Sequence, residues 1–271
     1  MSDKFRKIYE KSINNPENFW KEASEDIFWF KKPTKILNKS NPPFYKWFED
    51  GVTNTCYNAL DIHIDQGNGK RTALIYDSPI TGNKDKFTYE ELRMKVSKFA
   101  GALVNQGVNK GDRVIIYMPM IPEAVIAMLA CARIGAIHSV VFGGFASNEL
   151  ASRIDDSKAK ILITASCGFE PGRTVEYKPL VDEAVKQANH KIQKMILFQR
   201  SGHEVNLKEP DEISWDEALL NAKETDCTEM NSNELAYILY TSGTTGTPKG
   251  IVRDIGGHIV ALKWTMKNIY N

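Results

Sequence analysis

The segment from Thr241 to Gly250 carries the residue types in this sequence that are best suited to chemistry. It reads TSGTTGTPKG, in which eight of ten residues are serine, threonine or glycine and one is a lysine, Lys249. Glycines let the backbone approach an anion closely, hydroxyl and amide groups donate hydrogen bonds, and an ammonium group supplies a full positive charge. This combination predicts a cradle for a polyphosphate. Fixed donors placed where charge develops on a leaving group are each worth on the order of a few kcal/mol in the barrier.

A loop of this composition can also be a plain connector between elements. Its position favours the phosphate role, because the apolar run 235–240 directly precedes it and ligands gather beyond strand ends in open α/β sheets. It is not a Walker A loop, which needs Gly-Lys followed by Ser or Thr, whereas Lys249 stands between Pro248 and Gly250. An unrelated NTPase that uses the Gly-Thr loop is therefore the weakest of the functional alternatives.

The elements that must position this loop alternate along the chain. From residue 71 onward, short apolar runs are separated by helical patterns, which is typical of a largely parallel α/β sheet. A capping box of Thr88 and Glu91 predicts the start of a helix that ends at Gly107, and Pro122 and Gly135 bracket a second helix. The other expected elements are strands at 113–118, 137–142, 160–164, 194–198 and 235–240, and helices that begin near 16, 147, 178 and 214.

Composition and charge exclude several classes of protein. With 271 residues, 42% of them apolar, the chain can fold as a globular body, in which we expect residues 1–66 to wrap onto a larger domain at 67–271. Thirty-five basic and 34 acidic residues leave a net charge of +1, which predicts no general attraction to nucleic acid or membrane. The charged N-terminus and the short apolar runs indicate neither a leader nor a membrane span, so we expect a cytoplasmic protein.

Cysteines and histidines are scattered without a ligand-like spacing. No Cys-x-x-Cys pair occurs, which argues against a zinc site or a disulfide framework and favours reduced thiols. We therefore expect no resident metal and read His138 as a packed histidine within a strand. Other tempting side chains are read as core residues, namely Cys131, Met118, Met120 and Met128.

The segment YTSGTTGTPKG, residues 240–250, resembles the phosphate-binding signature of the adenylate-forming superfamily, which includes acyl-CoA synthetases, luciferases and peptide-synthetase adenylation domains. The resemblance implies that the loop holds the terminal phosphates of ATP, which arrives with Mg²⁺. A carboxylate then attacks the α-phosphate and yields an acyl-adenylate and pyrophosphate. This role carries onto Thr241, Ser242, Gly243, Thr244, Thr245, Gly246 and Lys249.

Three further segments resemble the acetyl- and propionyl-CoA synthetase branch of that superfamily, at 18–33, 47–63 and 135–164. The resemblance implies the α/β fold of an adenylate-forming N-terminal domain, with largely parallel sheets flanked by helices and incomplete at its C-terminal end. Residues 1–66 would be the extension typical of this branch. The stretch 250–264, with Arg253-Asp254 followed by Gly256-Gly257-His258, is more similar to the propionyl type.

The segment 168–184 resembles the part of these enzymes that contacts coenzyme A. In that comparison Arg173 faces a phosphate of the CoA nucleotide, and Glu170, Pro171 and Gly172 line the contact. Acetyl-specific members often place an arginine where Glu170 stands, and this difference again favours the propionyl type.

The resemblance also implies working parts beyond Asn271. Family members are more than twice as long, and their acyl pocket, magnesium-binding motif, ribose-binding aspartate and catalytic lysine follow the region matched here. We therefore expect the N-terminal portion of a short-chain acyl-CoA synthetase that converts acetate or propionate, ATP and CoA to acyl-CoA, AMP and pyrophosphate, with little or no activity alone. The alternative is a non-catalytic fragment that binds CoA or nucleotide, or pairs with a separate C-terminal portion.

Overall fold

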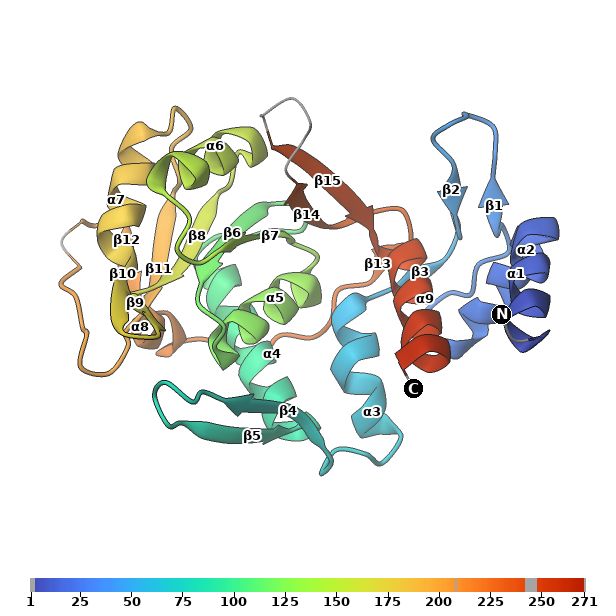
Figure 1. Cartoon of the computed structure of the whole chain (residues 1–271), viewed down its shortest axis with the longest axis horizontal. Coiled ribbons are helices and arrows are strands. Elements are labelled where there is room, and N and C mark those ends of the chain that lie inside the picture. Colours follow the sequence, from blue (N-terminus) through green and yellow to red (C-terminus); the bar gives the residue numbers. More distant parts are fainter. Residues whose placement is uncertain (1–2, 208, 242–247, 271) are drawn as a thin grey trace.

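A seven-stranded sheet forms the centre of the structure (Figure 1). The protein is described from a computed structural model that covers residues 3–207, 209–241 and 248–270. The strand order is β12-β11-β8-β6-β7-β14-β15, and every neighbouring pair is parallel except β14 with β15. The strands are β6 (Arg113–Met118), β7 (Ile137–Phe142), β8 (Ile161–Ala165), β11 (Lys194–Phe198), β12 (Glu212–Ser214), β14 (Leu235–Thr241) and β15 (Lys249–Asp254).

Helices cover both faces of this sheet, as Figure 1 shows. The core on one face joins Ile116 of β6 to side chains of α4 (Tyr89–Asn105) and α5 (Pro122–Ile134). The core on the other face joins Ile115 of β6 to side chains of α6 (Ser147–Ser157) and α7 (Tyr177–Gln187). Because neighbouring residues of a strand point to opposite faces, a strand buried on both sides is a continuous apolar run. The expected α/β architecture is confirmed.

Local signals in the sequence place several elements correctly. Thr88 Oγ1 accepts from the Glu91 amide at 3.2 Å and Glu91 Oε2 accepts from the Thr88 amide at 2.8 Å, so the capping box before α4 is confirmed. Helix α5 ends at Gly135, whose φ of +72° is the left-handed conformation that glycine adopts easily. Strands β6, β7 and β11 have the predicted bounds.

Several elements were not predicted, among them two hairpins and one helix. The hairpin of β4 (Thr72–Asp77) and β5 (Lys84–Thr88) is largely solvent-exposed, so its strands lack a strong apolar alternation. The hairpin of β9 (Cys167–Glu170) and β10 (Arg173–Glu176) occupies what was expected to be a loop. Helix α1 (Asp3–Asn14) is a charged surface helix. Met120, expected in the core, is 89% exposed because it lies in the turn between β6 and α5.

The N-terminal segment packs against the last helix, α9 (Ile255–Thr265), although the two are far apart in the sequence (Figure 1). The rings of Phe19 and Trp264 lie 5.5 Å apart between centroids, and those of Trp20 and Trp264 lie 6.1 Å apart. The remaining elements are α2 (Pro16–Ala23), η1 (Ser24–Asp26), β1 (Leu37–Asn38), β2 (Lys46–Trp47), β3 (Val52–Thr53), η2 (Tyr57–Asp61), α3 (Ile62–Asp65), α8 (Trp215–Leu219), β13 (Met230–Asn231) and η3 (Met266–Tyr270).

A buried ion pair ties this segment to the main sheet domain. Arg133 of α5 donates to both carboxylate oxygens of Asp61, at 2.8 and 3.0 Å, and its side chain is only 2% exposed. Burial lowers the pKa of Arg133, but the bond to Asp61 outweighs this and the pKa lies above its usual value. Asn54 adds hydrogen bonds to the carbonyls of Ala132 and Arg133.

None of the helices in the described ranges is long and apolar enough to cross a membrane.

Replacing Arg133 with methionine should lower the free energy of unfolding by about 3 to 5 kcal/mol, because Asp61 is left as a buried charge without its partner. The matched control is Lys32→Met, which breaks the exposed pair with Glu25, 70% and 59% exposed, and should cost under about 1 kcal/mol. Urea unfolding of both variants is the measurement. Equal losses would show that the Arg133 pair does not hold the N-terminal segment in place.

Candidate functional site

The two ends of the Gly-Thr loop are held side by side by the pairing of β14 with β15. Thr241, the last residue of β14, lies opposite Lys249, the first residue of β15, and Tyr240 lies opposite Gly250. Both Thr241 and Lys249 are exposed, and within the described ranges Lys249 makes no ion pair. The pairing therefore places the lysine and the threonine side by side at the two ends of the loop.

The predicted phosphate-binding residues between these ends, Ser242, Gly243, Thr244, Thr245 and Gly246, lie outside the described residues.

Helix α6 contacts the residues that flank the loop. Tyr240 donates its hydroxyl proton to Asp156 Oδ2 at 2.6 Å, and the guanidinium carbon of Arg153 lies 5.3 Å from the centre of the Tyr240 ring. Burial, followed by the bond to Asp156, raises the pKa of Tyr240, so the hydroxyl stays protonated at neutral pH. A Cβ on Gly250 would lie 3.2 Å from Tyr240 Cε1 and 3.4 Å from Asp156 Oδ2, which leaves little room for any side chain there. The residues that flank the loop, Tyr240 and Gly250, are thus tightly packed against α6.

A cavity of about 360 Å³ opens near the carboxyl ends of β6, β7 and β11, at the same edge of the sheet as the Gly-Thr loop. Asp77 at the end of β4, Glu170 from the β9–β10 hairpin and Arg200, which follows β11, contribute its charged groups. Apolar and aromatic side chains supply much of the remaining wall, including Met118, Met120, Phe142, Phe169 and Tyr177. Such a mixture suits a ligand with an aromatic ring and an anionic group.

The four residues predicted to contact coenzyme A form the tip of the β9–β10 hairpin. Pro171 and Gly172 make the turn, where Gly172 has a φ of +77°. Arg173 donates to Glu170 Oε2 from Nε at 2.7 Å and from Nη2 at 2.6 Å. Glu170 lines the cavity, whereas Arg173 is 71% exposed and lies outside the lining. The structure therefore brings the four together, with the Arg173 guanidinium engaged by a carboxylate.

Two features of this cavity were not predicted from the sequence. Arg200 is buried, and its guanidinium carbon lies 4.7 Å from the centre of the Phe169 ring. Gly143 comes so close to Tyr177 that a Cβ there would lie 2.3 Å from the tyrosine hydroxyl. The available signals were an arginine just beyond a buried strand and the Gly-Gly pair after another, since polar residues and glycines at strand ends mark ligand sites in such sheets.

His138 lies in β7, opposite Tyr237 of the neighbouring strand β14, and was predicted to be a packed histidine. Its ring stacks on Tyr237 with centroids 5.6 Å apart, and His258 of α9 makes an edge-on contact with Tyr237 at 5.0 Å. The residue is half-buried, but its Nδ1 atom is enclosed and has no hydrogen-bond partner. Burial, with a smaller contribution from His258, lowers the pKa of His138 to about 4. The ring is therefore neutral near pH 7.

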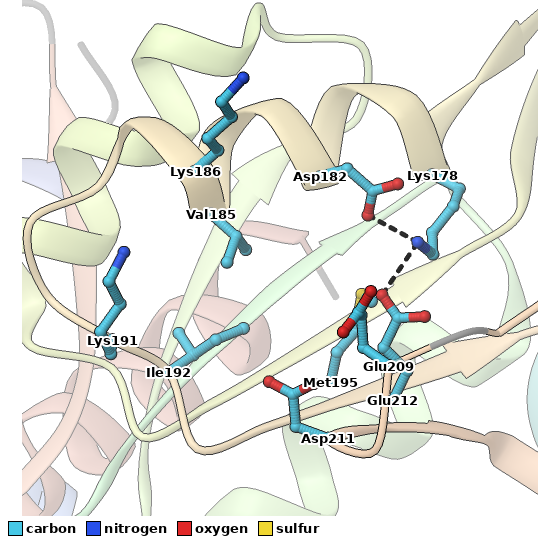
Figure 2. A pocket seen from close by; sticks show the side chains of 10 residues that line it. All are labelled: Lys178, Asp182, Val185, Lys186, Lys191, Ile192, Met195, Glu209, Asp211 and Glu212. Carbon is cyan, nitrogen blue, oxygen red and sulfur yellow. Dashed lines mark hydrogen bonds and ion pairs between the residues drawn. The ribbon is translucent and has the colours of Figure 1, made fainter.

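A second cavity, of about 400 Å³, lies between α7 and the β11–β12 edge, and Figure 2 shows its lining. Lys178 sits between Asp182 and Glu212, at 2.6 and 2.9 Å. Burial disfavours its charged form, but these two bonds outweigh it and raise the pKa of Lys178. Lys186 and Lys191 also line the cavity, but with Glu209 and Asp211 its carboxylates outnumber its ammonium groups, which disfavours a phosphate ligand.

Comparison with known proteins agrees with the α/β fold of the sheet. The profile of AMP-binding enzymes matches residues 63–270, which is most of the chain. This chain belongs to the AMP-binding enzyme family. The profile of the acetyl-coenzyme A synthetase N-terminus matches residues 5–59, so the predicted membership of the acetyl/propionyl-CoA synthetase branch is confirmed.

Individual members of the AMP-binding family are similar over nearly the whole chain. The human protein "Acyl-CoA synthetase short-chain family member 3, mitochondrial" is 53% identical over 96% of this chain and 38% of its own length. "Acetyl-coenzyme A synthetase" of Streptomyces coelicolor is 45% identical over 95% of this chain and 39% of its own length. The structure "Acetoacetyl-CoA Synthetase from Streptomyces lividans" has a TM-score of 0.84 at 25% identity, over 95% of this chain and 39% of that one. The chain thus spans about two fifths of the length of these relatives.

Acidification should destabilise the protein through His138. The unfolded chain takes up a proton near the usual pKa of 6.5, whereas the folded chain resists protonation until about pH 4. Stability is therefore unaffected above pH 6.5 and falls as the pH drops toward 4, by about 1 to 2 kcal/mol at pH 5. His138→Phe should remove this part of the loss in urea unfolding at pH 7 and pH 5, whereas the exposed control His203→Phe should not. An unchanged pH dependence in His138→Phe would contradict the assignment.

Proposed function

We propose that this chain is the N-terminal portion of an AMP-forming short-chain acyl-CoA synthetase, which joins acetate or propionate to coenzyme A at the expense of ATP. The observation that supports it most is the Gly-Thr loop between β14 and β15, whose described ends place Lys249 opposite Thr241 in a chain of the AMP-binding family. The preference for propionate over acetate in this proposal rests on Glu170 and on the residues that follow the loop. The division into an extension, residues 1–66, and a first part of the adenylation domain, residues 67–271, is part of this proposal.

In this proposal the loop binds the terminal phosphates of ATP. Thr241, Ser242, Gly243, Thr244, Thr245 and Gly246 supply hydroxyl and amide donors, and Lys249 supplies the positive charge. Because Lys249 sits at the start of a paired strand, its backbone is fixed before the nucleotide binds, and less reorganisation is needed as charge develops on the pyrophosphate. Mg²⁺ arrives with ATP. Next to the described residues that flank the loop, the carboxylate of Asp156 already accepts a hydrogen bond from Tyr240. We therefore assign no Mg²⁺ ligand there.

Coenzyme A is proposed to place its nucleotide end at the cavity beside the β9–β10 hairpin. The aromatic wall suits an adenine ring, and Arg173 and Arg200 are the cations that could meet its phosphates. Since Arg173 is engaged by Glu170, a phosphate must displace that carboxylate before it pairs with the guanidinium. Glu170 would therefore act as a competitor that CoA replaces, with Pro171 and Gly172 at the turn beside it.

The parts that complete the reaction, among them the acyl pocket and the catalytic lysine, are proposed to lie in a C-terminal portion. We infer that the 271 residues alone have little ligase activity. The cytoplasm is proposed as the location. The second candidate is a CoA- or nucleotide-binding fragment without catalysis, which would bind both ligands but support no pyrophosphate exchange even when joined to the remaining portion of a relative. Steady ATP hydrolysis without any carboxylate would instead indicate an unrelated NTPase.

Replacing Lys249 with alanine should weaken binding of Mg-ATP to the 271-residue chain about tenfold or more, because the single ammonium group facing the phosphates is lost. Isothermal titration calorimetry with ATP and with pyrophosphate measures this. The matched control is Lys263→Ala, an exposed lysine on α9, which should leave both affinities unchanged. Equal affinities for the two variants would remove Lys249 from the proposed site.

Substitutions at the hairpin tip should change CoA affinity in opposite directions. Glu170→Gln should tighten CoA binding about threefold to tenfold, since the competing carboxylate is gone, and Arg173→Met should weaken it by a similar factor. Glu25→Gln, which alters another exposed ion pair, is the control and should have no effect. Calorimetric titration with CoA and with dephospho-CoA is the measurement. Weaker binding by Glu170→Gln would contradict the proposed competition.

A further inference from the structure

Two cysteines that the sequence separates widely meet beside the buried ion pair. Cys56, at the start of η2, and Cys227, in the segment before β13, place their Sγ atoms and a carboxylate oxygen of Asp61 within 4.8 Å of one another. Arg133 Nη1 donates to Cys56 Sγ at 3.5 Å, and Cys227 Sγ donates to Asp61 Oδ2 at 3.6 Å. The closeness of these two thiols was not predicted, because spacing along the chain does not show which residues the fold brings together.

The two thiols differ in exposure and in their neighbours. Cys56 is fully buried and accepts a hydrogen bond from the guanidinium of Arg133. Cys227 is half-buried, so a small solute reaches it first, and Asp61 is placed to take its proton. Its hydrogen bond to Cys56, followed by burial, raises the pKa of the Cys227 thiol, so we expect a slow reaction that needs excess oxidant.

A metal ion could in principle use the same three ligands, Cys56, Asp61 and Cys227. Arg133 argues against it, because its guanidinium already contacts Asp61 and Cys56, two of the three. A divalent cation bound there would lie next to a fixed positive charge in a buried site. The two sulfurs, in contrast, lie close enough for a covalent bond between them after side-chain rotation, so the cluster is better suited to a disulfide than to a cation.

We propose that Cys56 and Cys227 are a modification site at which a small peroxide, such as hydrogen peroxide, forms a disulfide. The Cys227 thiolate attacks one peroxide oxygen, the O–O bond breaks, and the released hydroxide takes up a proton to leave as water. Cys56 then attacks the sulfenic sulfur, the S–O bond breaks, and a second water leaves. Two thiols lose two electrons and two protons, and one hydrogen peroxide is reduced to two waters.

The disulfide would join the two parts of the chain that match different family profiles. Cys56 lies in the stretch that matches the acetyl-coenzyme A synthetase N-terminus, and Cys227 lies in the stretch that matches AMP-binding enzymes. Closing the sulfurs from within 4.8 Å to a bond of about 2.05 Å requires rotation of the two side chains. The disulfide would add a covalent link to the contact that Arg133 and Asp61 make by hydrogen bonding alone. It does not involve the Gly-Thr loop, so it stands or falls independently of the proposed function.

The test treats the purified 271-residue chain with excess hydrogen peroxide and then with catalase. We expect the four free thiols to fall to two, a mass loss of two hydrogens, and a peptide linking Cys56 to Cys227. After limited proteolysis between these positions, the fragments should stay joined until a reductant is added. The melting temperature should rise by about 5 °C or more and return on reduction.

Matched variants separate this pair from the other cysteines. The double variant Cys131→Ala, Cys167→Ala should still form the link, whereas Cys227→Ser and Cys56→Ser should not, with circular dichroism confirming that each variant is folded. Four remaining thiols, stable sulfinic acid at Cys227, or a link through Cys131 or Cys167 would overturn the proposal. Stoichiometric Zn²⁺ that blocks oxidation, together with a thiolate charge-transfer band on adding Co²⁺, would instead identify a metal site.

Discussion

The antiparallel pairing of β14 with β15 is the interaction on which the proposed site depends. All other neighbours in the sheet are parallel, so the chain must cross over between them, as it does through α5 after β6 and α6 after β7. β15 instead returns directly beside β14, and this reversal fixes both ends of the Gly-Thr loop, with Thr241 opposite Lys249. The residues that flank the loop are held from α6 through the bond of Tyr240 to Asp156. A lysine on an unpaired loop would have to be ordered by the nucleotide itself, at a cost in conformational entropy.

The sequence predicted most of the main sheet because local and periodic signals agree there. Thr88 with Glu91 begins one helix, Gly135 ends another, and largely apolar runs define β6, β7 and β11, of which β6 and β11 are buried on both faces. The hairpins β4–β5 and β9–β10 were not predicted, since short exposed strands carry little apolar pattern. For the candidate site, the loop was found because its composition is itself the signal.

Features that depend on contacts between distant residues could not be read from the sequence. Arg200 resembles any surface arginine until the fold buries it against Phe169. The same holds for Arg133, whose partner Asp61 belongs to the N-terminal segment, and for the two cysteines beside it. Long-range packing, and not residue type, decides these roles. The aromatic packing of Trp20 and Phe19 on Trp264 likewise shows how the extension and α9 depend on each other.

The central claim is that the backbone between Thr241 and Gly250 binds the phosphates of ATP, while the cavity by Glu170 receives coenzyme A. Hydrogen–deuterium exchange of the chain, alone and with saturating Mg-ATP or CoA, tests this most directly. Bound phosphates should slow exchange of the amides at 241–250, and CoA should slow those at 142–145 and 168–173. Protection by ATP elsewhere, with exchange at 241–250 unchanged, would contradict the account.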